Sequence, residues 1–75
     1  MNKFLIHLKS INEVKDFVRV VNDFPYEVDL ASGRYIVDAK SIMGIFSLDL
    51  TQPIAVEVHQ ADCGDLLEKL KPFMD

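Results

Sequence analysis

The sequence predicts an α+β fold, an open-faced β-sandwich in which a four-stranded antiparallel sheet carries helices on one face. Three observations lead to this prediction. Apolar residues recur with period two in some segments and at helical spacing in others. These segments follow one another in the order β-α-β-β-α-β-α. Nearly half of the 75 residues are apolar (49%), which indicates a packed core, and the length fits a single domain over residues 1–75.

The first strand is predicted over residues 4–8 and the first helix over residues 11–22. The strand alternates poorly, which is typical of a central strand covered on both faces. Ser10 and Glu13 form an S-x-x-E capping box that opens the helix. The predicted apolar side of this helix consists of Ile11, Val14, Phe17, Val18 and Val21. Pro25 follows and ends the segment, since proline also restricts the residue before it.

A β-hairpin is predicted next. Residues 26–30 alternate cleanly between apolar and polar side chains, as a half-buried strand does. Residues 31–34 contain Gly33 and form the predicted turn, and residues 35–39 form the returning strand.

The last three elements are a short helix, a strand and a terminal helix. Ser41 is a favourable N-cap for a helix over residues 42–47. Residues 54–58 again alternate and form the fourth strand. Asp62 is predicted to cap the last helix, and Pro72 to weaken or end it. The apolar stripe of that helix consists of Leu66, Leu67, Leu70, Phe73 and Met74.

Composition excludes several classes of partner. The net charge is −4 and the sequence has no cluster of Lys or Arg, so a nucleic-acid partner is excluded. No apolar run approaches the roughly 20 residues of a membrane span, and no signal peptide is visible. The single cysteine, Cys63, cannot form an internal disulfide, which fits a reducing cytoplasm. We therefore expect a cytoplasmic protein with no membrane association.

The run KSIMGIFSLDL over residues 40–50 is the most specific motif. It resembles the regulatory-serine segment of HPr, the small phosphocarrier of the bacterial sugar phosphotransferase system, in its Gram-positive form. Weaker similarity extends from about Phe17 to the end, and the order of elements and the length are also similar to those of HPr. The resemblance implies that Ser41, preceded by Lys40, is phosphorylated by an ATP-dependent kinase. It also implies a partner-binding surface made of Lys40, Ile42, Met43 and Phe46.

The active-site motif of that family, glycine-apolar-histidine-alanine-arginine-proline, is missing. By alignment on Ser41, the histidine position falls on Ser10, the arginine position on Asn12 and the proline position on Glu13. The link between the first strand and the first helix is also several residues shorter. Phosphoryl transfer needs an imidazole nucleophile and a cation for the phosphoryl charge. Ser10 is a weak nucleophile, and Glu13 adds negative charge where the phosphate would lie.

Each candidate residue also has a purely structural interpretation. Ser41 can be an N-cap and nothing else, and Phe46 can belong to the core with Met43 an ordinary surface residue. His7, in a predicted strand, is interpreted as a packed or hydrogen-bonded side chain. His59 and Cys63 are four residues apart, and two ligands are too few for a convincing metal site. We therefore expect no metal and no cofactor.

These observations favour an HPr-like regulatory or protein-interaction module that lacks phosphohistidine transfer and is not an enzyme. Its expected partners are proteins: an HPr-type serine kinase, another phosphotransferase-system component, or a second copy of the chain in a homodimer. One alternative is a phosphocarrier whose chemistry has moved to His7 or His59, which would require an exposed histidine beside an arginine or a helix N-terminus. The other is a small structural or oligomerisation domain with no phosphate role.

Overall fold

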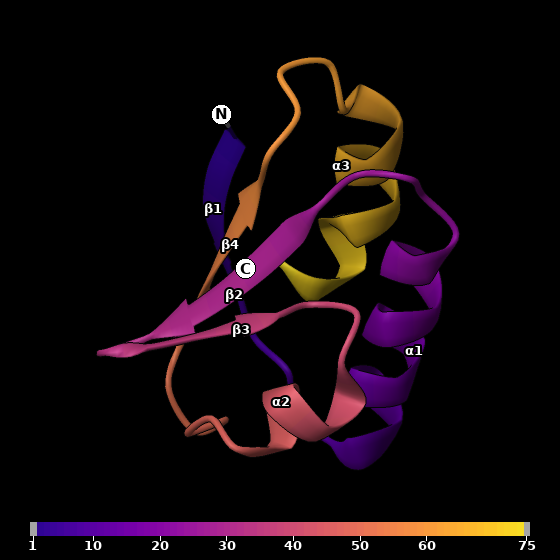
Figure 1. Ribbon diagram of the computed structural model, residues 1–75. Helices are drawn as coiled ribbons and strands as arrows, with labels where there is room; N and C mark the ends of the chain where they lie inside the picture. The colour runs from indigo at the N-terminus through magenta and orange to yellow at the C-terminus, as the bar shows by residue number, and fades with distance from the viewer. Residues whose placement is uncertain (1, 75) are drawn as a thin grey trace.

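The computed structural model describes residues 2–74, and their order of elements is the predicted one (Figure 1). The elements are β1 (Asn2–Ile6), α1 (Ile11–Asn22), β2 (Val28–Ser32), β3 (Tyr35–Asp38), α2 (Ile42–Phe46), β4 (Ile54–Val58) and α3 (Gly64–Leu70), which a 3₁₀ turn (Lys71–Phe73) continues. No helix among these residues is long and apolar enough to cross a membrane.

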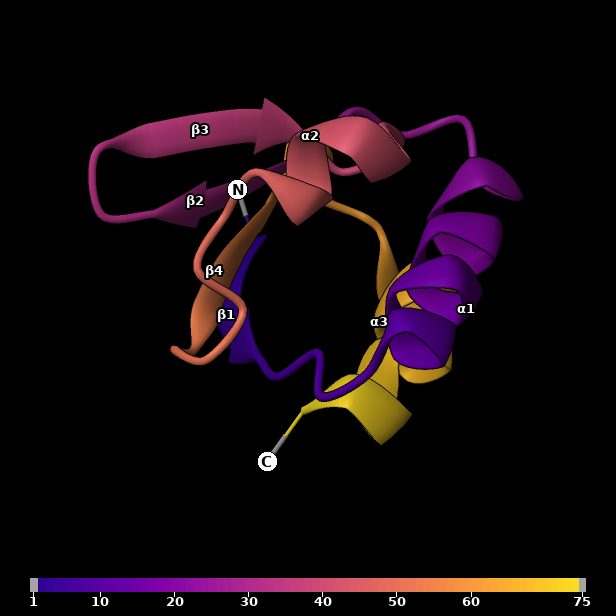
Figure 2. The same ribbon diagram turned by 90° about the horizontal axis from the view of Figure 1, so that it is seen from below.

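The four strands form one antiparallel sheet in the order β1-β4-β2-β3. Helices α1 and α3 contact each other and cover one side of this sheet, whereas no described helix covers the other side (Figure 2). The shorter α2 contacts α1 and β3. The predicted α+β open-faced sandwich is therefore confirmed.

The core lies between the sheet and the helices. The strands contribute the alternate positions that the period-two pattern predicts, among them Val28, Leu30 and Val56. The helices contribute Val14, Phe17, Val21, Ile45, Leu66 and Leu70. The Phe17 and Phe73 rings meet edge to face with centroids 5.5 Å apart, which ties α1 to the C-terminal turn.

The prediction for the first strand was wrong in position and in role. The strand covers Asn2–Ile6 rather than residues 4–8, and it lies at an edge of the sheet. Its side chains do alternate, because Ile6 is buried whereas Lys3 and Leu5 are exposed. Leu5 hid the alternation in the sequence, because an apolar side chain occupies a solvent-facing position.

The first strand of the hairpin lies two residues later than predicted, since β2 covers Val28–Ser32 and only Gly33 and Arg34 form the turn, whereas the returning strand begins at Tyr35 as predicted and ends one residue earlier, at Asp38. Gly33 has φ +60°, and the pair Ser32–Tyr35 closes the ladder next to the turn. A two-residue turn with glycine at its first central position is the type II′ arrangement, whose twist matches that of the flanking strands.

Two details of the helices differ from the sequence prediction. Helix α3 begins at Gly64, and its N-cap residue is Cys63, which makes no side-chain capping bond; Asp62 is not the cap. The carboxylate of Asp65 instead accepts a hydrogen bond from the Leu66 N–H in the first turn. In α1, Ile11 is exposed, although its spacing placed it on the apolar side. Ile11 is the first residue of the helix, and the first fully buried residue of α1 is Val14, one turn later.

Candidate functional site

The N-terminus of α1 occupies the position that corresponds to the active site of the resembled family. Ser10 is the N-cap, and its hydroxyl accepts a hydrogen bond from the Glu13 N–H at 3.1 Å. The Glu13 carboxylate accepts a hydrogen bond from the Lys9 N–H at 3.3 Å, so the predicted capping box closes one residue earlier than expected. Two oxygen acceptors thus satisfy backbone donors at this helix end, and one of them is negatively charged.

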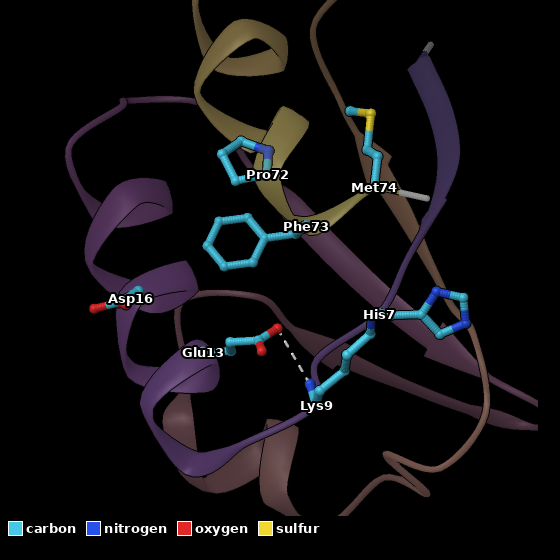
Figure 3. A pocket seen from close by; sticks show the side chains of 7 residues that line it. All are labelled: His7, Lys9, Glu13, Asp16, Pro72, Phe73 and Met74. Atoms are coloured by element: carbon cyan, nitrogen blue, oxygen red, sulfur yellow. Dashed lines mark hydrogen bonds between the residues drawn. The ribbon is translucent and has the colours of Figure 1, made fainter.

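A shallow hollow of about 280 Å³ lies beside this helix end (Figure 3). Its walls are His7, Lys9, Glu13 and Asp16 on one side and Pro72, Phe73 and Met74 of the C-terminal turn on the other. The ring of His7 points away from Glu13 and Asp16, and its backbone N–H donates to the Phe73 carbonyl at 2.9 Å. The hollow therefore combines two carboxylates with one lysine and contains no arginine.

Ser41 is the N-cap of α2. Its exposed hydroxyl accepts a hydrogen bond from the Gly44 N–H at 3.2 Å, and its own N–H donates to the Asp38 carbonyl at 3.0 Å. The hydroxyl lies on the surface, where a modifying enzyme has access to it. Capping and accessibility therefore coexist at this residue.

Lys40 is half-buried, and both of its nitrogens have partners. The Nζ ammonium donates to the Phe24 carbonyl at 2.9 Å, and the backbone N–H donates to an Asp38 carboxylate oxygen at 2.8 Å. The side chain thus links the start of α2 to the segment that leaves α1. Nothing in the sequence pattern indicated this role.

Exposure divides the apolar residues of α2 into two groups. Ile45 is fully buried and Ile42 is half-buried against the core, whereas Met43 is 78% exposed and Phe46 is 41% exposed. The beginning of α1, with the exposed Ile11, lies at the same end of the molecule as α2 (Figure 1). Three exposed apolar side chains, Ile11, Met43 and Phe46, therefore lie at this end among exposed polar residues.

His59 lies among carboxylates at the end of β4. Its Nε2 is 2.8 Å from a carboxylate oxygen of Asp29 on β2. The hydrogen bond with Asp29 is the main cause that raises the pKa of His59; desolvation opposes it, and the charges of Asp29, Glu57 and Glu27 raise the pKa further. Within residues 2–74 the ion-pair partner of His59 is a carboxylate and not an arginine, and the nearest helix along the chain begins only at Gly64.

The pair of His59 and Cys63 does not form a metal site in the structure. Cys63 is buried, its sulfur accepts a hydrogen bond from the Asn2 amide at 3.0 Å, and His59 is engaged with Asp29. Within residues 2–74, no group of three or more His, Cys, Asp or Glu side chains is arranged to hold a metal ion.

Comparison with known proteins places these observations in a family context. A family model described as "PTS HPr component phosphorylation site" matches residues 10–75. The structure is similar to that of HPr-C-His from Thermoanaerobacter tengcongensis, with a TM-score of 0.79 and 25% sequence identity over 93% of this chain and 86% of that chain. It is also similar to the phosphocarrier protein HPr from Bacillus anthracis str. Ames, with a TM-score of 0.74 and 26% identity over 99% of this chain and 94% of that chain. No curated protein matches the sequence.

Proposed function

The chain belongs to the HPr family of the sugar phosphotransferase system, and we propose that it acts there as a regulatory protein-interaction module without phosphohistidine transfer. The family works with other proteins of that system, so its partners are proteins. In this proposal the chain binds and signals, and it catalyses no reaction itself. Its place of action is the cytoplasm.

The observation that carries the proposal is the chemistry at the start of α1. Ser10 stands at the histidine position of the family. Its hydroxyl already caps the helix, and its described hydrogen bond is to the backbone N–H of Glu13, not to a side chain that could act as a general base. The Glu13 carboxylate accepts a hydrogen bond from the backbone N–H of Lys9, beside Ser10. A phosphoryl group at this helix end would meet a negative charge in place of the cation that phosphoryl transfer requires.

The surroundings of the two histidines argue against a relocated phosphocarrier site. His59 is paired with Asp29 and lies within the field of Glu27 and Glu57, so a phosphoryl group on its ring would face repulsion from three carboxylates. His7 lines a hollow that it shares with two carboxylates. The residues that line the hollow beside His7 include one lysine and no arginine, and the His59 ring is held by a carboxylate rather than by a cation.

A labelling experiment tests the absence of phosphohistidine transfer. We expect the chain to stay unlabelled after incubation with the general phosphotransferase enzyme and labelled phosphoenolpyruvate. The HPr of Bacillus anthracis, treated in the same way, is the positive control. Acid-labile label on His7 or His59 would show that the chain is a working phosphocarrier.

Within the same proposal, Ser41 is the regulatory residue and the α2 surface is the partner contact. The exposed hydroxyl of Ser41 supports modification by an HPr-type serine kinase, and the exposed side chains of Met43 and Phe46 support docking beside it. Incubation with such a kinase and ATP should label the wild type and Ser10→Ala, which retains the target, but not Ser41→Ala. Equal labelling of wild type and Ser41→Ala would remove Ser41 from the proposal.

The α2 surface can be tested separately from Ser41. If it pairs two copies of the chain, sedimentation will detect a wild-type dimer that Met43→Lys dissociates. If it binds a phosphotransferase-system component, the wild type will bind that component and Met43→Lys will not. A wild type that is monomeric and binds neither a kinase nor such a component would favour a structural domain without a phosphate role.

A further inference from the structure

The side of the sheet that faces away from α1 and α3, here called the outer face, has an unusual composition (Figure 2). Side chains alternate between the two sides of a sheet, so the positions between the buried ones belong to the outer face. On the four strands these are Lys3, Leu5, Asp29, Ala31, Ile36, Asp38, Ala55 and Glu57. Neither helix covers them.

An apolar row crosses the whole outer face. In the strand register Leu5 pairs with Ala55, Ala55 with Ala31, and Ala31 with Ile36. The row therefore passes through all four strands without a polar residue and spans about 14 Å at the usual strand spacing. Its two ends are open to solvent, since Leu5 is 60% exposed and Ile36 is 71% exposed. A contiguous exposed apolar patch that is rimmed by polar residues is typical of an interaction surface.

An acidic row runs directly beside the apolar one. Here Lys3 pairs with Glu57, Glu57 with Asp29, and Asp29 with Asp38. Three of these four side chains are carboxylates, and among them Asp29 has an ion-pair partner in His59 when that imidazole is protonated. Within residues 2–74, neither Glu57 nor Asp38 forms an ion pair.

The acidic character continues past the end of this row. A hollow of about 370 Å³ has Glu27, Asp29 and Asp38 in its walls, together with Val28 and Lys40. The Lys40 ammonium is bound to the Phe24 carbonyl and Asp29 is paired with His59, so Glu27 and Asp38 are the carboxylates of this hollow that have no ion-pair partner within residues 2–74. A lysine or arginine side chain from outside would supply the missing charge.

We propose that the outer face is a docking surface for a protein that presents apolar side chains flanked by lysine or arginine. The apolar row would bury against the partner's apolar residues, and the acidic row and hollow would receive its cations. Such charge complementarity fixes the orientation of a partner and speeds its association. This surface lies on β1–β4, whereas Met43 and Phe46 lie on α2, so it is a second contact region, different from the one proposed on that helix.

Other occupants fit the charges less well. Nucleic acid and anionic membranes carry the same sign of charge as the acidic row. A second copy that packs its own outer face here brings a net charge of −4 and the same three carboxylates. The surface therefore favours a foreign, cationic protein.

NMR titration of the isotope-labelled protein with an amphipathic helical Leu/Lys peptide tests the proposal. We expect shift changes at the amides of Leu5, Ala31, Ile36 and Ala55, and weak or no binding of the matching Leu/Glu peptide. Because Ile36→Lys places a charge at an apolar contact, it should weaken binding about tenfold or more, which corresponds to about 1.4 kcal/mol or more. Added salt should weaken it as well.

Ile11→Lys is the matched control, since it introduces the same charge at a similarly exposed apolar residue on α1. It should bind the Leu/Lys peptide nearly as tightly as the wild type. Ile36→Thr, which keeps a β-branched side chain, replaces Ile36→Lys if the latter does not fold. Shift changes confined to α2, equal losses in the Ile36 and Ile11 variants, or a wild-type dimer that Ile36→Lys dissociates would each overturn the proposal. None of these outcomes depends on whether the chain carries phosphohistidine.

Discussion

Two serines perform the same local task in this molecule. Ser10 and Ser41 each precede a helix, and each hydroxyl accepts the N–H of the third residue that follows, at 3.1 and 3.2 Å. Their surroundings differ, because Ser10 shares its helix end with the Glu13 carboxylate. Capping alone accounts for a serine at both positions. Ser41 would differ from Ser10 in its chemistry only if a kinase phosphorylates it, as proposed above.

The cap at Ser41 predicts a specific order of stability. Ser41→Ala should lower the free energy of unfolding by about 0.5–2 kcal/mol, because the Gly44 N–H loses its acceptor. Ser41→Asp should remain close to the wild type, since aspartate caps well and its charge is favourable at a helix N-terminus. Urea denaturation of the three proteins measures this order. An aspartate variant much less stable than the alanine variant would show that the serine does not act as a cap.

His59 predicts a pH dependence. Because its pKa is raised in the folded state by Asp29, its stabilising contribution is fully present below the unfolded-state pKa of about 6.5 and is lost as the pH rises through the folded-state pKa. The stability difference between the wild type and Asp29→Asn should therefore be larger near pH 5.5 than near pH 8.5. An NMR titration should also give a lower His59 pKa in Asp29→Asn. A pKa that does not change would mean that the Asp29 contact is absent in solution.

At the scale of elements, α2 is a short helix with one side in the core and one side in water. Ile45 is fully buried and Met43 is 78% exposed, although the two residues are only two positions apart in the sequence. Met43→Lys should therefore leave the unfolding free energy nearly unchanged, whereas Ile45→Ala should lower it by about 2–5 kcal/mol. Denaturant titration of both variants measures the difference. An unfolded Met43→Lys protein would mean that Met43 belongs to the core.

The β2–β3 hairpin depends on the backbone of one glycine. A Cβ at Gly33 meets no atom within 4 Å, but φ is +60°, where other residues are strained. Gly33→Ala should cost about 1–2 kcal/mol for this reason alone. Gly64→Ala is the matched control: it has the same open space and an ordinary φ, so it should be neutral or slightly stabilising. Equal effects of the two substitutions in thermal denaturation would contradict a strained turn at Gly33.

For the whole molecule, the sequence was sufficient to predict the order of elements, the core pattern of α1, β2 and β4, and both serine caps. Periodicity and capping are local properties, which explains this success. The family resemblance rested mainly on one specific string, residues 40–50, and the family is confirmed by the family match over residues 10–75.

The features that escaped prediction depend on contacts between distant segments. The edge position of β1 follows from its pairing with β4, and the pairs Lys40–Phe24 and His59–Asp29 join residues 16 and 30 positions apart. Leu5 and Ile11 were assigned to buried positions because they are apolar, although the structure exposes both. Hydrophobicity alone does not tell a core residue from one on a contact surface. The outer face was missed for the same reason.

The strand order also has a kinetic consequence. β2 and β3 are joined by a two-residue turn, whereas β1 pairs with β4 from the opposite end of the chain, with Asn2 beside Val58. Closing so long a loop is entropically unfavourable until the intervening segments are already compact. We expect β1 to join the sheet after the folding transition state. Substitutions in β1 would then speed unfolding and leave the folding rate almost unchanged, whereas Leu30→Ala in β2 would slow folding. Stopped-flow kinetics would show which end of the sheet assembles first.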